Sequence, residues 1–297
     1  MRQTVLYAIL LLWAKSVALF PLRVLYVFSD VLCFFIHRVI RYRLKVVRRN
    51  LRNAFPDQTD RERRRTERRF YRHFADYIVE TVKLAHISQE EVMRRARIRN
   101  PEIIRPLLAQ GHTCLILLLG HYGNWEWFTG ATPFFGGEVQ VFQIYRPLKS
   151  PAFDRLFLFL RGRFHARGIR KNEVIRELIR LRQAGTPSLV VFMADQTPSK
   201  ANLHYWTTFL HQESAILTGP ERIASRLNLP VIYVDAQKVK RGYYTVDFEL
   251  MTDRPKEMPE HWITEEYARR MERSILRDPA YWLWTHKRWK YKKSMSK

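Results

Sequence analysis

The chain has 297 residues and is 46% hydrophobic and 13% aromatic, which excludes a disordered tail and provides enough apolar material for one large domain or two small ones. It carries 52 Lys and Arg against 28 Asp and Glu, a net charge of +24. Such a charge favours anionic partners, namely nucleic acid, acidic lipid surfaces or acidic proteins. The two cysteines, Cys33 and Cys114, lie in apolar runs. They are too few for a disulfide framework or a cysteine zinc site, so we expect buried thiols and no metal.

An apolar segment opens the chain. Val5 to Leu22 contains one charged residue, Lys15, and approaches the ~20 apolar residues that span a bilayer. No small-residue cleavage site follows it, which disfavours a removed signal peptide. A second apolar run covers Val24 to Ile36. We predict membrane-inserted or membrane-lying helices, and therefore a membrane-anchoring segment over residues 1–37; a helix pair of an ordinary core is the alternative.

A strongly basic segment follows the apolar one. Arg38 to Arg69 holds thirteen Lys or Arg and four Asp or Glu, a net of +9. Basic residues after a hydrophobic segment favour the cytoplasmic side and acidic headgroups, although a solvated helix face has the same composition. Apolar residues then recur at helical spacing, which predicts a helix that folds back onto a core: Phe70, Phe74, Ile78 and Val82.

Strands and helices alternate beyond residue 110. The expected strands are His112–Leu119, Val139–Ile144, Ser188–Met193, Val231–Ala236 and Tyr243–Leu250. The expected helices are Trp125–Thr129, Pro151–Phe164, Asn172–Ala184, Gly219–Leu227 and Thr264–Leu276. This alternation predicts an α/β fold, a central mixed sheet flanked by helices, with residues 38–297 forming one catalytic domain. In such sheets sites form where strands end, and His121 and Asp195 follow the first and third expected strands.

The spacing His-x-x-x-x-Glu occurs three times and is weak evidence alone. The pairs are His86/Glu91, His121/Glu126 and His261/Glu266. Positions five apart on one helix are ~140° apart around its axis, so a histidine can meet the glutamate only from outside the helix.

The surroundings of His121 distinguish it from the other two. It stands between Gly120 and Gly123, directly after an apolar strand, and the glycines would let a substrate come close. Asn124 is a good helix N-cap, which places Glu126 in the first turn, where the helix dipole favours an ionised carboxylate. A carboxylate beside an imidazole fixes its tautomer and stabilises the imidazolium. We therefore predict a general base with its orienting acid; a turn histidine satisfied locally is the alternative.

The sequence contains no G-x-x-x-x-G-K-[ST] phosphate loop and no G-x-S-x-G elbow. With no nucleophile indicated beside His121, the pattern favours direct transfer, in which the histidine activates a substrate hydroxyl.

Five blocks in order carry a family resemblance. "GHYGNWEW" resembles the HX4D/E motif of the late lipid A acyltransferases, the Kdo2-lipid A lauroyl/myristoyl acyltransferase family within the lysophospholipid acyltransferase superfamily. The other four blocks are "YRP" at Tyr145–Pro147, "RGRF" at Arg161–Phe164, "ADQ" with Asp195 and Gln196, and "PAYWLWTHKRWK" near the end. The resemblance covers essentially the whole chain.

The resemblance implies an enzyme at the cytoplasmic face of a bacterial inner membrane. It would move a fatty acyl chain from acyl carrier protein to a hydroxyl of a lipid A precursor. The phosphopantetheine thioester arrives on the donor, so no bound cofactor is implied. His121 would be the base, oriented by Glu126, and Arg163 would stabilise the oxyanion, with Arg161 as the alternative.

Further roles follow from the same blocks. Arg146 would bind an acceptor phosphate or pair with a structural acid. Tyr145, Arg161 and Gln196 would contact substrate. Asp195 would be either catalytic or structural, holding an arginine.

Two other functions remain as alternatives. One is a glycerophospholipid or aminolipid acyltransferase of the same superfamily. The other is a nucleic-acid-binding protein, suggested by the charge and by aromatics among basic residues in "WLWTHKRWKYKK". The second explains neither the apolar N-terminus nor the His–Glu turn, so we expect no nucleic-acid partner.

Overall fold

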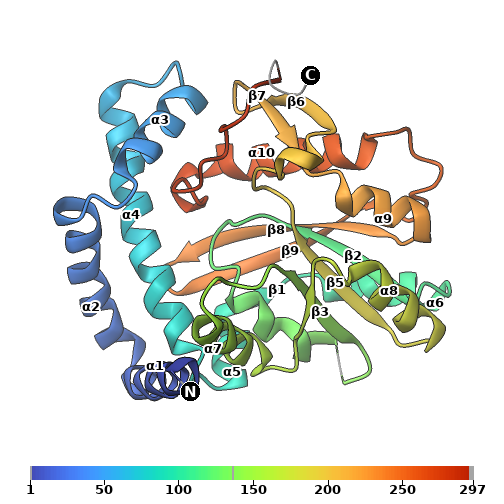
Figure 1. The fold of residues 1–297 in the computed structure, drawn as a ribbon, viewed down its shortest axis with the longest axis horizontal. Coiled ribbons are helices and arrows are strands. Elements are labelled where there is room, and N and C mark those ends of the chain that lie inside the picture. The colour runs from blue at the N-terminus through green and yellow to red at the C-terminus, as the bar shows by residue number, and fades with distance from the viewer. Residues whose placement is uncertain (1, 136, 294–297) are drawn as a thin grey trace.

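A seven-stranded mixed sheet lies at the centre of the molecule (Figure 1). The computed structural model describes residues 2–135 and 137–293. The strand order is β1-β9-β8-β2-β5-β3-β4, and among these described strands the β8–β9 pair is antiparallel while the others pair in parallel. The strands are β1 (Ala96–Ile98), β2 (Cys114–Leu119), β3 (Gln140–Tyr145), β4 (Arg167–Arg170), β5 (Ser188–Met193), β8 (Val231–Lys240) and β9 (Tyr243–Thr252).

The central strands β2 and β5 position the site. All six residues of β2 are buried, as expected for a parallel strand covered on both faces. The two strands pair in register, with Leu119 opposite Met193. His121 and Asp195 each lie two residues further along, so the polar residues that follow both strands leave the sheet at the same edge.

Helices cover both faces of the sheet (Figure 1). They are α5 (Gln89–Arg95), α6 (Ile104–Ala109), α7 (Pro151–Gly162), α8 (Val174–Gln183), α9 (Gly219–Leu227) and α10 (Trp262–Arg277), with a small antiparallel pair, β6 (Tyr205–Phe209) and β7 (Gln212–Ile216). The expected α/β architecture is confirmed, as are all five expected strands and four of the five expected helices. β1, β4, β6 and β7 were not predicted.

The expected helix Trp125–Thr129 is wrong in type and length. The structure has a turn and then the 3₁₀-helix η3 (Trp127–Phe135). This segment contains Gly130 and Pro133, both of which disfavour a regular α-helix.

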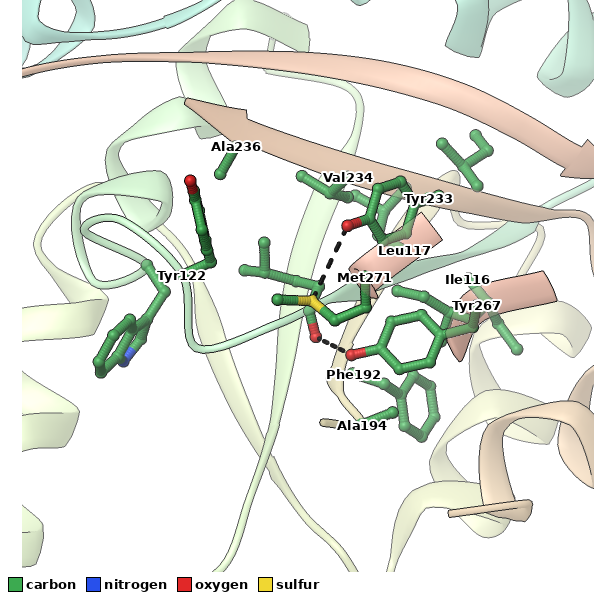
Figure 2. Close-up of a cluster of buried hydrophobic side chains, with 14 of the residues drawn as sticks. Ile116, Leu117, Tyr122, Phe192, Ala194, Tyr233, Val234, Ala236, Tyr267 and Met271 are labelled. Atoms are coloured by element: carbon green, nitrogen blue, oxygen red, sulfur yellow. Dashed lines mark hydrogen bonds between the residues drawn. The ribbon is translucent and has the colours of Figure 1, made fainter. Parts of the chain in front are cut away.

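The face of the sheet beneath α10 is filled by aromatic and branched side chains (Figure 2). The Tyr267 hydroxyl donates to the Leu119 carbonyl at 3.1 Å, and Met271 packs beside it. Gly120 lies against this helix, because a Cβ there would overlap the Met271 sulfur. The glycine before His121 is therefore explained by packing within the protein, rather than by the approach of a substrate.

An N-terminal helical layer forms one side of the molecule, drawn in blue to cyan in Figure 1. It consists of α1 (Arg2–Leu19), α2 (Leu22–Phe34), the π-helix η1 (Phe35–Val39), α3 (Leu44–Ala54) and α4 (Asp60–Lys83). The chain bends at Pro21 between the two apolar helices. α1 is long and apolar enough to cross a membrane, with 11% of its residues buried. The expected apolar helices at the N-terminus are thus present.

Helix α4 joins this layer to the sheet. It begins with a capping box made by Thr59 and Glu62. Phe70 is fully buried, and Phe74 and Ile78 pack against the core, which confirms the predicted helix that folds back. Ala14, Ala18 and Leu25 of the apolar helices share a buried cluster with Leu84 and with residues of α7. The division between residues 1–37 and 38–297 stays a prediction.

Candidate active site

His121 and Asp195 form a close polar pair at this edge of the sheet. The Nδ1 atom of His121 lies 2.6 Å from Oδ1 of Asp195, and the His121 backbone N–H donates to Oδ2 at 3.0 Å. The indole N–H of Trp282 donates to the same Oδ2 at 2.8 Å. The Asp195 side chain is 2% exposed and that of His121 is 16% exposed, so a buried acid holds a ring that still reaches the surface.

The electrostatics favour an ionised Asp195. Burial alone would raise its pKa, but attraction to His121 and hydrogen bonds from His121 and Trp282 lower the pKa of Asp195 to about 2. An ionised Asp195 accepts, so the Nδ1–H of His121 donates to it. In the neutral ring this leaves a lone pair on Nε2.

The second ring nitrogen faces Gln196. The Gln196 side-chain amide donates to His121 Nε2 at 3.1 Å. A hydroxyl that replaced this amide would meet a lone pair suited to accept its proton.

Glu126 is engaged by Arg161. The Arg161 guanidinium donates to both carboxylate oxygens, at 2.7 Å and 2.5 Å, and the Tyr77 hydroxyl lies 3.5 Å from Oε1. Glu126 was predicted to be the acid that orients His121. The structure brings Asp195 to the His121 ring instead and gives Glu126 a bidentate partner from α7.

The turn between β2 and η3 is held from two directions. Gly123 adopts φ +64°, a conformation that favours glycine. On one side, the Gly123 N–H donates to the Tyr281 carbonyl at 3.0 Å, and the Leu283 N–H donates to the His121 carbonyl at 3.1 Å. On the other, His73 of α4 contacts the Gly123 carbonyl at 3.1 Å. These contacts fix the backbone that presents His121.

Asn124 holds the turn that leads into η3, rather than capping a helix that contains Glu126. Its Oδ1 accepts from the Trp127 N–H at 3.2 Å, and its amide donates to Glu80 at 2.7 Å. Glu80 is completely buried and also accepts from Tyr244 at 2.8 Å and Tyr26 at 2.9 Å. Burial raises the pKa of Glu80. One carboxyl group thereby connects α2, α4, β9 and the turn.

A comparison of the sequence with protein-family models identifies the family of the chain. The model of the bacterial lipid A biosynthesis acyltransferases matches residues 1–291, nearly the whole chain. The chain belongs to this family. No curated protein matches it. The protein is therefore an acyltransferase that acts on lipid A, which favours lipid A over the glycerophospholipid alternative.

In this acyltransferase the other predicted residues lie as follows. Arg163 ends α7 and donates to the backbone carbonyls of Leu84 and Ile87, at 2.6 Å and 3.2 Å; burial lowers its pKa. These contacts tie two helix ends together. Arg146 is exposed after β3, and no described residue forms an ion pair or hydrogen bond with its side chain. Tyr145 lines a small cavity together with Arg161.

The other two His–Glu pairs of the acyltransferase lie at the surface. Glu91 pairs with Arg94 and Arg95. Glu266 pairs with Arg270 at 2.6 Å. In all three pairs the glutamate therefore binds an arginine, on the helix surface for Glu91 and Glu266 and at a buried position for Glu126.

Several residues that shape the site were not predicted. Trp282 lies in the C-terminal block that carried the resemblance, but nothing in that block indicates which carboxylate it contacts. His73, Tyr77 and Glu80 are three or four residues apart on one face of α4, and this face contacts the turn. The spacing is visible in the sequence, but it does not indicate which segment this face contacts. Among the described residues, no cluster of His, Cys, Asp and Glu could hold a metal ion.

Proposed function

We propose that the enzyme transfers a fatty acyl chain from acyl carrier protein to a hydroxyl of a lipid A precursor, with His121 as the general base. The observation that carries this proposal is the His121–Asp195 pair, in which Nδ1 is bound at 2.6 Å and Nε2 is left as the acceptor. Asp195 takes the orienting role that was first assigned to Glu126. A histidine held in this way can both accept and return a proton.

The reaction then proceeds in two steps. The acceptor hydroxyl displaces the Gln196 amide from His121 Nε2, gives its proton to that nitrogen and attacks the thioester carbonyl. The tetrahedral intermediate collapses, the carbon–sulfur bond breaks, and the imidazolium returns the proton to the leaving phosphopantetheine sulfur. The ester and a free thiol are the products, and no further reactant is needed.

The oxyanion requires a donor near the reacting carbon. The Gln196 amide lies beside His121 Nε2 and is our candidate donor once it is displaced. Arg161 is bound to Glu126. This ion pair would supply a fixed dipole near the reacting carbon and a rigid wall of the active site. Arg163 was proposed from the resemblance, but its contacts with two backbone carbonyls favour a structural role.

The acceptor and donor both carry negative charge. Arg146 is exposed at the end of β3 and is our candidate for an acceptor phosphate, with Tyr145 beside it. The net charge of +24 would attract an acidic carrier protein and anionic headgroups.

The proposed location is the cytoplasmic face of the bacterial inner membrane. Apolar side chains of the N-terminal helices stand in solvent, among them Ile9, Leu12 and Val27 at 59%, 69% and 64% exposure. Exposed apolar surfaces of this kind indicate a membrane or protein contact. The basic segment that follows favours the cytoplasmic side.

The transfer is tested with purified full-length enzyme, a lipid A precursor and a series of acyl carrier protein thioesters of different chain length. Mass spectrometry should show one added acyl chain on the precursor and free thiol on the carrier. Transfer from acyl-coenzyme A alone would overturn the donor assignment, and transfer only to a glycerophospholipid would overturn the acceptor.

The location has a separate test. Membranes washed with high salt and carbonate should retain the full-length chain until detergent is added. Release by salt alone would show that the apolar helices are not inserted.

A further inference from the structure

A basic cavity lies at the bend between the two apolar helices. It has a volume of about 1000 Å³ and is walled by the Pro21 bend, the end of α4, α5 and the β8–β9 turn. We call it the hinge cavity. In Figure 1, α1, the end of α4 and α5 lie at the lower left, and α2 rises from there along the left side.

The walls of the hinge cavity are predominantly cationic. The basic lining residues are Arg23, Lys83, His86, Arg94, Arg95 and Arg241. Among the described residues that line it, Glu91 is the one carboxylate. Several cations that face one open cavity favour the binding of an anion there.

Some of these cations hold the walls in place. Arg241 binds Asp30 of α2 at 2.8 Å and Asp76 of α4 at 2.6 Å. The Lys83 ammonium donates to the carbonyls of Ala18 and Phe20 at the end of α1, at 2.6 Å and 3.0 Å. The cavity is therefore preformed, and its shape does not depend on a ligand.

Other basic side chains of the lining remain available. Within the described chain, the side chains of Arg23 and His86 form no hydrogen bond or ion pair, and both are exposed. Arg94 shares Glu91 with Arg95 and keeps 64% of its side chain exposed. These three groups offer N–H donors from different elements, as an anion with several oxygens requires.

The surface beside the cavity indicates what carries the anion. Leu19, Phe20 and Val24 flank the bend and are 63%, 49% and 38% exposed. An anion that enters the cavity past these apolar side chains would be the polar end of a molecule that also carries a hydrocarbon chain. We propose that the hinge cavity binds the phosphate headgroup of an anionic bilayer phospholipid, whose acyl chains lie along α1 and α2.

The hinge cavity is connected to the catalytic turn through hydrogen bonds. Tyr26 lines it and donates to Glu80, which in turn accepts from Asn124 of the catalytic turn. The proposal rests on the proposed membrane association but is independent of the transfer chemistry.

The test measures lipid binding directly. Full-length enzyme in neutral detergent is titrated with phosphatidylglycerol, phosphatidylethanolamine, a lipid A precursor or inorganic phosphate, and retained lipid is counted by native mass spectrometry. One phosphatidylglycerol should be retained with a preference on the order of tenfold or more over phosphatidylethanolamine. The double variant Arg23→Gln/Arg94→Gln should lose about tenfold or more of that affinity.

A matched variant controls for net charge. Arg176→Gln/Arg222→Gln removes two exposed cations from α8 and α9, at the right of Figure 1, and should bind within about twofold of the wild type because these side chains lie outside the cavity. Both variants should keep the wild-type melting temperature, since the altered side chains are exposed.

Four results would overturn the proposal. They are equal losses in the two variants, equal binding of both phospholipids, full competition by inorganic phosphate, and retention of the lipid A precursor in place of phosphatidylglycerol. The last would assign the cavity to the acceptor. None of these results depends on acyl transfer, so failure here is distinct from failure of the proposed reaction.

Discussion

The two carboxylates of the site have similar burial but different partners. Asp195 and Glu126 are both about 2% exposed at the side chain. Asp195 is bound to an imidazole, a group that can accept and return a proton, whereas Glu126 is bound to a guanidinium, which keeps its protons. Burial alone therefore does not identify the acid that takes part in proton transfer; the chemistry of its partner does.

His121→Ala should have the largest effect, because it removes the group that both acids were candidates to orient. Turnover should fall by about 10³- to 10⁴-fold with the circular dichroism spectrum unchanged. It is measured at saturating donor and acceptor, so that weaker binding does not lower the rate. His261→Ala, from a surface pair with the same spacing, should stay within a few-fold of wild type. Near-normal transfer by folded His121→Ala would refute the mechanism.

Asp195→Asn should be the next most damaging change. The amide can donate to Nδ1 and favour the wrong tautomer, so turnover should fall by about 10²- to 10³-fold. The substitution removes the lone pair on His121 Nε2 that accepts the proton, but it leaves the substrate contacts in place. The Michaelis constants should therefore change little. A variant that loses affinity but keeps its turnover would place Asp195 in substrate binding.

The same variant should change the pH dependence of stability. The pKa of Asp195 is about 2 in the folded protein and ~3.9 in an unfolded chain. The ionised group thus adds about 2–3 kcal/mol, which is present in full above pH ~4 and is lost as pH falls toward 2. In urea titrations, the stability difference between wild type and Asp195→Asn should narrow below pH ~4. If the stability difference between the two proteins does not change with pH, the partners of Asp195 do not stabilise its ionised form.

Glu126→Gln should affect stability more than chemistry. It leaves the Arg161 cation, 22% exposed, without its carboxylate, which costs on the order of 2–4 kcal/mol. Turnover should fall by about ten- to a hundredfold, through displacement of the turn. The double variant Glu126→Gln/Arg161→Met should recover stability in thermal melts without recovering the rate. Recovery of both would show that the pair is purely structural; a loss as deep as that of His121→Ala, with stability intact, would return the orienting role to Glu126.

Arg163→Lys should have the smallest effect. A lysine can keep one of the two bonds to the Leu84 and Ile87 carbonyls, so the melting temperature should fall by a few degrees while turnover stays within about threefold. A loss of a hundredfold at unchanged stability would restore Arg163 as the oxyanion-stabilising residue.

The sequence predicted the sheet better than the contacts at its edge. The five expected strands have long apolar or alternating runs, and they are present. β4 reads RGIR and has one buried residue, and β1 has three residues in all. Such short edge strands are defined by pairing with a neighbour and have little pattern of their own.

The candidate residues could be predicted, but their pairing could not. His121 and Asp195 both follow central strands of equal length, and the adjacency of β2 and β5 would have been enough to bring them together. The expected helix capped by Asn124 favoured Glu126 as the partner of His121, yet the turn directs Glu126 toward Arg161 of α7. The Glu126 contacts come from Tyr77 of α4 and Arg161 of α7, which are distant in the sequence, so the pairing depends on tertiary structure.

Helix α4 has a consequence for which hydroxyl the enzyme can acylate. Its 24 residues extend about 36 Å, and its end holds the last carbonyls of α1 through Lys83 while its middle holds the turn that carries His121. If α1 lies in the bilayer, the depth of that helix fixes the height of the imidazole above the lipid headgroups. The enzyme would then select among the hydroxyls of one lipid by their distance from the bilayer, before any pocket contacts them.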